Sequence, residues 1–123
     1  MAEECGYEGM AVNLSRSDVV ICALQGDFGK PRPALVVQSD LFNETHASFV
    51  ICPITSHIVE APLFRITLKP GTKSGLKIRS QVMVDKLVTI SREKIAKKIG
   101  ELSSLEMDKV DRALALWLDL IRG

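Results

Sequence analysis

The sequence predicts a mainly β fold, a small barrel with a C-terminal α-helix. Short runs of branched and aromatic residues recur about every ten residues, with Gly, Pro or polar turn residues between them. Near the C-terminus the spacing of apolar residues changes to that of a helix. The chain has 123 residues, enough for one hydrophobic core but not for two. We therefore expect a single domain over residues 14–123, preceded by a loose arm or tag remnant over residues 1–13.

The first half of the chain contains three expected strands. Asp18–Leu24 is a short run of branched residues, and Pro33–Gln38 is an apolar run that follows a loop rich in glycine and proline. A polar connection over Ser39–His46 leads to Ala47–Thr55, in which branched and aromatic residues again predominate. Segments of this length and composition are typical of strands in small barrels.

The second half is expected to add three more strands. Leu63–Leu68 alternates moderately well between apolar and polar residues, and a turn over Pro70–Gly75 separates it from a longer strand over Gln81–Ile90. Ser91–Lys94 has the character of a helical turn, and Ile95–Ile99 is expected to be the last short strand. These strands complete the expected barrel.

The C-terminal segment has the signature of an amphipathic helix. Ser103 and Glu106 match a capping box, in which a hydroxyl and a carboxylate satisfy free amides of the first helical turn. The apolar residues that follow recur on one side of a helix: Met107, Val110, Ala113, Leu114, Trp117, Leu118 and Ile121. We interpret this stripe, Trp117 included, as core packing. Leu116 and Leu120 lie beside it and add apolar surface where a second copy of the chain could pack.

Composition and cysteine content narrow the class of protein. The chain is 46% hydrophobic and 25% charged, the balance of a soluble globular protein, and no apolar run approaches the ~20 residues of a membrane span. Its N-terminus has neither the basic nor the apolar part of a secretory signal. Three cysteines without CxxC spacing, Cys5, Cys22 and Cys52, predict neither a disulfide nor a metal site. We expect a cytoplasmic protein without cofactor or metal, in which Cys22 and Cys52 are buried thiols.

Arg32 is the first residue of functional interest. It lies between Pro31 and Pro33 at the end of the loop Gly26–Pro33, and the two prolines restrict the backbone around it. A permanently charged guanidinium on a stiff backbone suits the binding of a phosphate or a carboxylate. An ordinary loop arginine beside a turn is the alternative interpretation of the same residues.

The net charge of +1 hides a separation of charge along the chain. Residues 69–98 contain nine basic and two acidic residues, a net charge of +7, whereas the rest contains seven basic and thirteen acidic residues, a net charge of −6. Because the basic residues are interleaved with strand-like residues, alternate side chains would share one face. The pattern predicts a positive surface for a polyanion, although a charged run is often only a solvated face.

Several short motifs follow one another along the chain. They are Lys30-Pro31-Arg32-Pro33, Cys52-Pro53-Ile54-Thr55-Ser56, Gly75-Leu76, Ser80-Gln81-Val82, Asp85-Lys86-Leu87-Val88-Thr89-Ile90 and Ile99-Gly100-Glu101-Leu102-Ser103. Their order, spacing and flanking strands resemble the PemK/MazF family of toxin–antitoxin toxins. The resemblance extends from about Leu14 to Ile121, nearly the whole chain.

This resemblance implies an SH3-like barrel of the CcdB/MazF type that acts as a homodimer. It also implies a growth-inhibiting toxin and mRNA interferase, an endoribonuclease that cuts single-stranded RNA at short sequences without a metal ion. The products would carry a 2′,3′-cyclic phosphate and a 5′-hydroxyl, and a cognate antitoxin would silence the toxin. The family's functional arginine falls on Arg32, and its threonine, third in the Pro-x-Thr segment, falls on Thr55.

RNA can be cleaved without a metal because its own 2′-hydroxyl is the nucleophile. The protein must help to remove that proton, protonate the departing 5′-oxygen and stabilise the extra charge on the phosphoryl group. Arg32 suits charge stabilisation and possible acid work, with Thr55 donating a hydrogen bond, but an arginine is a poor base because its pKa exceeds ~12. The candidates for the general base are Asp27, His57, Asp85 and a water-mediated route, and the sequence does not decide between them. His57 could instead be a solvated loop residue, and Asp85 the partner of a basic neighbour.

RNA recognition normally places unstacked bases against aromatic side chains and phosphates against cations. The expected RNA contacts are in the first loop and around the Pro70–Gly75 turn: Phe28, Lys30, Lys73, Lys77, Arg79 and Ser80. Two other functions remain open from the sequence. One is a CcdB-like poison of DNA gyrase that is not an enzyme, and the other is a barrel that binds nucleic acid or protein without chemistry. The pair Arg32 and Thr55 favours the endoribonuclease.

Overall fold

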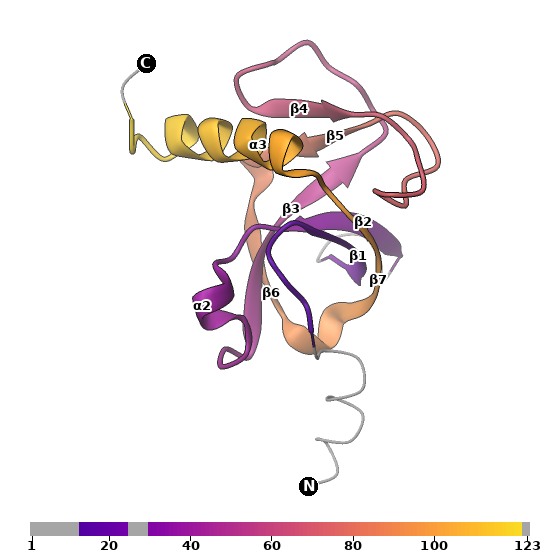
Figure 1. Cartoon of the computed structure of the whole chain (residues 1–123), viewed down its shortest axis with the longest axis vertical. Coiled ribbons are helices and arrows are strands. Elements are labelled where there is room, and N and C mark those ends of the chain that lie inside the picture. The colour runs from indigo at the N-terminus through magenta and orange to yellow at the C-terminus, as the bar shows by residue number, and fades with distance from the viewer. Residues whose placement is uncertain (1–12, 25–29, 122–123) are drawn as a thin grey trace, which may run out of the picture.

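The computed structural model describes residues 13–24 and 30–121, and in them a strongly bent antiparallel sheet is covered by a C-terminal helix (Figure 1). The strands are β1 (Asp18–Ala23), β2 (Pro31–Val36), β3 (Ser48–Thr55), β4 (Arg65–Leu68), β5 (Ser80–Met83), β6 (Val88–Ser91) and β7 (Ile95–Glu101). The helices are α2 (Asp40–Asn43) and α3 (Ser104–Trp117), with 3-10 turns at Val84–Lys86 and Arg92–Lys94. The expected mainly β barrel with a C-terminal helix is confirmed.

Strand β3 organises the sheet. The strand order is β4-β5-β3-β2-β1-β7, and β6 also pairs with β3. The first half of β3 lies between β2 and β6, since Ile51 is opposite both Val36 and Val88. The second half pairs with β5, where Thr55 is opposite Gln81. One long strand therefore joins the two parts of the barrel, and its last residue, Thr55, belongs to the part formed with β5.

The central strands are buried on both faces. On β2, Leu35 packs in one core cluster with residues of α3, whereas its neighbours Ala34 and Val36 pack in a second cluster with Phe49 and Ile95. Successive residues of a strand point to opposite faces, so a strand that is buried twice needs a continuous apolar run. This explains the lack of alternation in the central strands. Both described cysteines, Cys22 and Cys52, are buried as expected.

Three expected elements need correction. The expected strand Gln81–Ile90 is two strands, because a 3-10 turn at Val84–Lys86 divides it and sends β5 and β6 to different parts of β3. Strand β2 begins at Pro31, so Arg32 is a strand residue and not a loop residue. The connection Ser39–His46 contains the short helix α2, whose N-cap is Ser39. The expected turn before β7, and β7 itself, are confirmed.

Helix α3 begins with the predicted capping box, since the Ser103 hydroxyl accepts a bond from the Glu106 amide and the Glu106 carboxylate accepts one from the Ser103 amide. Its first turns bury Met107, Val110 and Ala113 against the sheet. The last part of the stripe is different, because Trp117 is 48% exposed, although its ring contacts that of Phe64 at 5.6 Å between ring centroids. The helix runs past the edge of β4 and β5, so no strand lies beneath its C-terminal end (Figure 1).

Two glycines join the turn before β5 to strand β7. A Cβ atom on Gly100 would lie 2.3 Å from the carbonyl oxygen of Lys73, and one on Gly75 would lie 2.2 Å from that of Ile99. Gly75 also has a φ of +78°, a conformation that side chains disfavour. The Glu101 amide donates to the Lys73 carbonyl at 2.8 Å. The turn is therefore held directly against the backbone of β7. Among the described residues no helix is long and apolar enough to span a membrane.

Candidate active site

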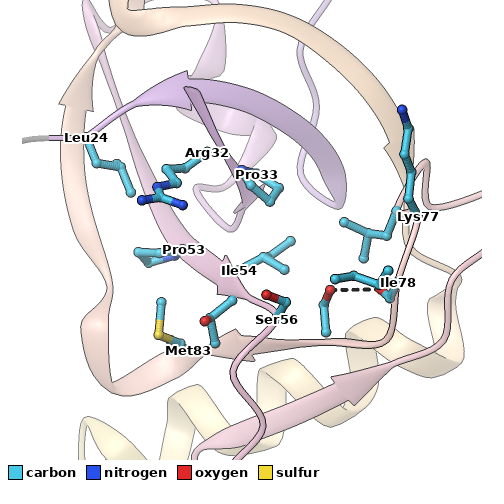
Figure 2. A pocket seen from close by; sticks show the side chains of 12 residues that line it. Leu24, Arg32, Pro33, Pro53, Ile54, Ser56, Lys77, Ile78 and Met83 are labelled. Atoms are coloured by element: carbon cyan, nitrogen blue, oxygen red, sulfur yellow. Dashed lines mark hydrogen bonds between the residues drawn. The ribbon is translucent and has the colours of Figure 1, made fainter. Parts of the chain in front are cut away.

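A pocket of about 470 Å³ opens at the end of the barrel where β2, β3 and β5 meet (Figure 2). Strands β2 and β3 form one side of it, and the segment that leads into β5 forms the other. Its lining residues are Leu24, Arg32, Pro33, Pro53, Ile54, Thr55, Ser56, Leu76, Lys77, Ile78, Ser80 and Met83. The pocket combines apolar walls with a guanidinium, an ammonium and three hydroxyls.

Arg32 projects from the start of β2, and its guanidinium points toward Pro53 (Figure 2). Its backbone is paired with Cys22 on β1. The backbone at Arg32 is therefore restricted by the sheet as well as by Pro31 and Pro33. The side chain itself is exposed to solvent and lines the pocket, so it brings a positive charge to this site.

The strand register explains why Arg32 and Thr55 share this pocket. Ala34 on β2 is opposite Pro53 on β3 in an antiparallel pair. Arg32 lies two residues before Ala34 and Thr55 two residues after Pro53, so the same register continued to the end of both strands places them side by side. Both line the pocket. Residues distant in sequence thus supply a cation and a hydroxyl to one site.

The Thr55 hydroxyl is oriented by the turn that follows it. Its Oγ1 accepts a hydrogen bond from the backbone N–H of His57 at 3.0 Å. An oxygen that accepts from this side keeps its own proton to donate elsewhere. Ser56 also lines the pocket, whereas the His57 side chain is exposed and is not among the lining residues. The structure therefore gives His57 a backbone role beside Thr55.

Asp85 is the candidate base that the structure argues against. Its carboxylate is bonded to Arg65 through two contacts, 2.8 Å to Nε and 3.2 Å to Nη2. The hydrogen bonds from Arg65 hold the pKa of Asp85 below its usual value, which makes this carboxylate a weaker base. It also lies outside the residues that line the pocket. The structure therefore supports the other interpretation of Asp85, in which this carboxylate is the partner of a basic residue.

We expect Asp85→Asn to lower stability at neutral pH and to flatten the loss of stability in acid. A folded-state pKa below the unfolded value of about 3.9 means that the carboxylate stabilises the fold above that value. The contribution disappears as the pH falls through the lower folded-state pKa. Breaking this pair, whose side chains are only 12% and 14% exposed, should cost about 2 kcal/mol. Thermal melts between pH 7 and pH 3 measure it.

The control for this prediction is Asp111→Asn. Asp111 also pairs with an arginine, Arg16, at 2.7 Å, but its side chain is 48% exposed, and exposed pairs contribute little. Equal melting temperatures of Asp85→Asn and Asp111→Asn at neutral pH would contradict the structural role of the Asp85 pair.

Comparison with known proteins assigns the chain to a family. Residues 15–118 match the model of the PemK-like, MazF-like toxin of type II toxin-antitoxin systems. The chain belongs to this family. A probable endoribonuclease MazF of Mycolicibacterium smegmatis is 37% identical over 87% of this chain and 98% of its own length. Endoribonuclease EndoA of Bacillus subtilis is 30% identical over 88% of this chain and 97% of its own.

Solved structures of MazF-like toxins share the fold. A mycobacterial endoribonuclease in complex with its cognate antitoxin superposes with a TM-score of 0.75 at 24% identity, covering 89% of this chain and 99% of that one. The Mycobacterium tuberculosis toxin MazF-mt6 has a TM-score of 0.74 at 21% identity, covering 85% and 99%. At these identities the likeness establishes the fold, and the PemK/MazF assignment rests on the sequence matches above.

Only some of the other residues that were expected to contact RNA in this PemK/MazF-like chain line the pocket. Lys77 and Ser80 line the pocket, and the Ser80 hydroxyl donates to the Ile78 carbonyl at 2.9 Å, the bond dashed in Figure 2. Lys30, Lys73 and Arg79 are exposed but are not among the lining residues. Asp27 and Phe28 lie outside the described residues, so their places in the site stay predictions.

The basic stretch 69–98 is not one continuous face. It crosses β5 and β6, which pair with different parts of β3, and β7, which pairs with β1. Arg92 is not a surface cation at all, because its buried guanidinium donates to the carbonyls of Asn43 and His46 and lies 4.7 Å from the centre of the Phe49 ring. Lys98 is paired with the buried Asp18 at 3.1 Å. Of the cations of this stretch, Lys77 lines the pocket.

Sequence reasoning missed the apolar walls of the pocket. Ile78 is 59% exposed although it is large and apolar, and Pro53 and Met83 lie across the pocket from it (Figure 2). The signal in the sequence was a lone isoleucine between Lys77 and Arg79 in a turn-rich segment. The part of the chain that the structure describes contains no group of three or more metal-ligating side chains.

Proposed function

We propose that this PemK/MazF-like toxin is an endoribonuclease that cleaves single-stranded RNA, mRNA included, at short sequences and without a metal ion. The observation that carries the proposal is the pairing of Arg32 and Thr55 in one pocket, reached from two adjacent strands. A guanidinium and a hydroxyl are donors, and donors suit an anionic phosphodiester. The names of the relatives, endoribonucleases MazF and EndoA, support the same activity.

The proposed reaction is an internal transfer of the phosphoryl group. The 2′-oxygen of the RNA attacks the adjacent phosphorus while its proton leaves to a base, and the bond from phosphorus to the 5′-oxygen breaks. The products are a 2′,3′-cyclic phosphate and a 5′-hydroxyl, the departing oxygen having taken up a proton. Arg32 stabilises the charge that develops on the phosphoryl oxygens, and Thr55 donates a hydrogen bond to them. With Asp85 paired, the remaining candidates for the base are Asp27, His57 and water.

Specificity for RNA sequence would come from the walls of the pocket. Single-stranded RNA can turn its bases out of the stack, and proteins bind such bases on apolar or aromatic surfaces. The pocket offers Pro53, Ile78 and Met83 as such surfaces, with Lys77 at its rim for a phosphate (Figure 2). Phe28 is a further candidate for stacking on a base.

We also propose a homodimer that is inhibited by a cognate antitoxin in the cytoplasm. The structural neighbours include a mycobacterial endoribonuclease solved with its cognate antitoxin and a MazE-MazF complex from Deinococcus radiodurans. The exposed apolar end of α3, with Trp117, Leu118 and Leu120, supplies surface that such partners could cover.

The proposed activity is tested by incubating the purified protein with a mixed single-stranded RNA in excess EDTA. Discrete fragments that end in a 2′,3′-cyclic phosphate and begin with a 5′-hydroxyl, identified by mass spectrometry, are the expected result. Intact RNA, together with a DNA-damage response in cells that express the protein, would instead indicate a gyrase poison of the CcdB type.

Replacing both Lys77 and Arg79 with alanine should weaken RNA binding and flatten its salt dependence. Each phosphate contact to single-stranded nucleic acid contributes about 0.7 to the slope of log K against log salt, so the loss of two contacts should reduce that slope by about 1.4. The measurement is RNA affinity at several salt concentrations. Lys109→Ala with Arg112→Ala removes the same charge from exposed positions of α3 and serves as the control. An equal reduction in both double variants would place the RNA elsewhere.

A further inference from the structure

Gln81 is a buried polar residue that the proposed reaction does not use. It lies on β5 between two strands, opposite Thr55 of β3 on one side and Thr67 of β4 on the other. Its side chain is 3% exposed. A buried amide is stable only when its donors and acceptor are bonded, so its partners indicate what it does.

The Gln81 amide holds one residue of the turn that follows Thr55. Its Oε1 accepts from the backbone N–H of Val59 at 3.1 Å, and its Nε2 donates to the backbone carbonyl of Val59 at 2.9 Å. Nε2 also donates to Thr67 Oγ1 at 3.2 Å. Both main-chain groups of Val59 are thus bonded to one side chain, much as a neighbouring strand would bond them.

This contact fixes the far end of a short turn whose near end is Thr55. The near end is fixed by the pairing of β3 with β5, and the Gln81 amide holds Val59, four residues later. Between them the His57 N–H donates to Thr55 Oγ1, and Ser56 lines the pocket. The position of the His57 amide, and with it the rotamer of the Thr55 hydroxyl, depends on both ends of the turn.

We propose that Gln81 is a positioning residue that orients the Thr55 hydroxyl through the turn 55–59, a role that rests on the endoribonuclease function proposed above. Gln81 does not touch the RNA. It keeps the backbone N–H of His57 in place to donate to Thr55 Oγ1, so that the Thr55 hydroxyl proton stays directed to the phosphate.

Gln81→Met tests the proposal, because methionine has a similar length and fills the same space without an amide. Misplacement of a reacting group by about 1 Å can reduce a rate about 100-fold, and a turn released at one end should reduce the single-turnover cleavage rate by about 10-fold. The KM should change little, because the walls that bind RNA are elsewhere. Gln81→Glu keeps the acceptor for the Val59 N–H and loses the donor, so it should lie between wild type and Gln81→Met.

Thr67→Val is the matched control. It removes the Gln81 bond to Thr67 and leaves both bonds to Val59 in place, so cleavage should stay at the wild-type rate. A loss in Thr67→Val equal to that in Gln81→Met would mean that any disturbance of this part of the sheet lowers activity, and would overturn the proposal.

A double-mutant cycle separates positioning from general structural damage. If Gln81 acts through Thr55, adding Gln81→Met to Thr55→Ala should cause no further loss of cleavage, because the group that it orients is absent. A further loss of the full size of the single variant would overturn the proposal. All rates are compared at a temperature well below the melting point of each variant.

Amide hydrogen exchange in the RNA-free protein provides a measurement that does not depend on activity. The amides of His57 and Val59 should exchange faster in Gln81→Met and at the wild-type rate in Thr67→Val. Unchanged exchange in Gln81→Met would overturn the proposal even if cleavage fell. A wild-type protein that leaves RNA intact would overturn the endoribonuclease function, and the exchange rates would then still show whether Gln81 holds the turn.

Discussion

Arg32→Ala should abolish RNA cleavage and leave the fold intact. Removal of one preorganised donor from an active site typically reduces the rate by about 100-fold to 1,000-fold, and a charged donor in the role proposed for Arg32 should be at the upper end. The side chain is exposed at the start of β2, so its loss opens no cavity. Single-turnover cleavage and a thermal melt of the same preparation measure the two parts of this prediction.

Two further variants show which property of Arg32 matters. Arg32→Lys keeps the positive charge and loses the planar pair of donors, so it should recover only part of the rate. Lys30→Ala removes a neighbouring exposed cation that is not among the lining residues, and it should lose much less of the cleavage rate than Arg32→Ala. Near-normal turnover by Arg32→Ala would remove the basis of the proposed mechanism.

Gly100→Ala should strongly destabilise the protein, and far more than the same substitution at Gly71. The new Cβ would meet the backbone of Lys73 and Ser74 at 2.3 Å, and neither atom belongs to a flexible side chain that could turn aside. Overpacking of this kind costs about 3 kcal/mol, which for a domain of this size should lower the melting temperature by roughly 10 °C. Calorimetry or a circular dichroism melt measures it.

Gly71→Ala is the matched control for Gly100→Ala. Gly71 lies in the turn that packs against Gly100, but a Cβ added to Gly71 would have nothing within 4 Å. The melting temperature of Gly71→Ala should therefore stay close to that of wild type. Equal melting temperatures for both variants would mean that the turn does not rest on β7 as described.

The sequence was sufficient to predict most of the fold, because its strongest signals are local. The Ser103–Glu106 capping box and the buried runs of β1 and β3 depend on neighbours in sequence. The division of the expected strand Gln81–Ile90 could not be predicted in this way, because apolar residues continue through the turn at Val84. The ion pair of Asp85 with Arg65 beside that turn joins residues far apart in the chain.

The candidate site was only partly predictable for the same reason. Arg32 could be predicted as a functional residue from the two prolines beside it, and Thr55 could be predicted from the family resemblance. Their shared pocket follows from the register of β2 against β3, which no local pattern specifies. The role of the Gln81 amide depends on its contact with Val59, 22 residues earlier in the chain.

The pairing of β1 with β7 affects when this protein can become active during its synthesis. β1 binds β2 soon after both are made, but its other edge pairs with residues near the far end of the chain, Asp18 with Glu101. Helix α3, made later still, completes the core cluster that contains Leu35 and Val82. Contacts between such distant segments form late and slowly. A partly translated chain therefore lacks a finished barrel, and the activity proposed above would have to wait until the C-terminal end of the chain has been made.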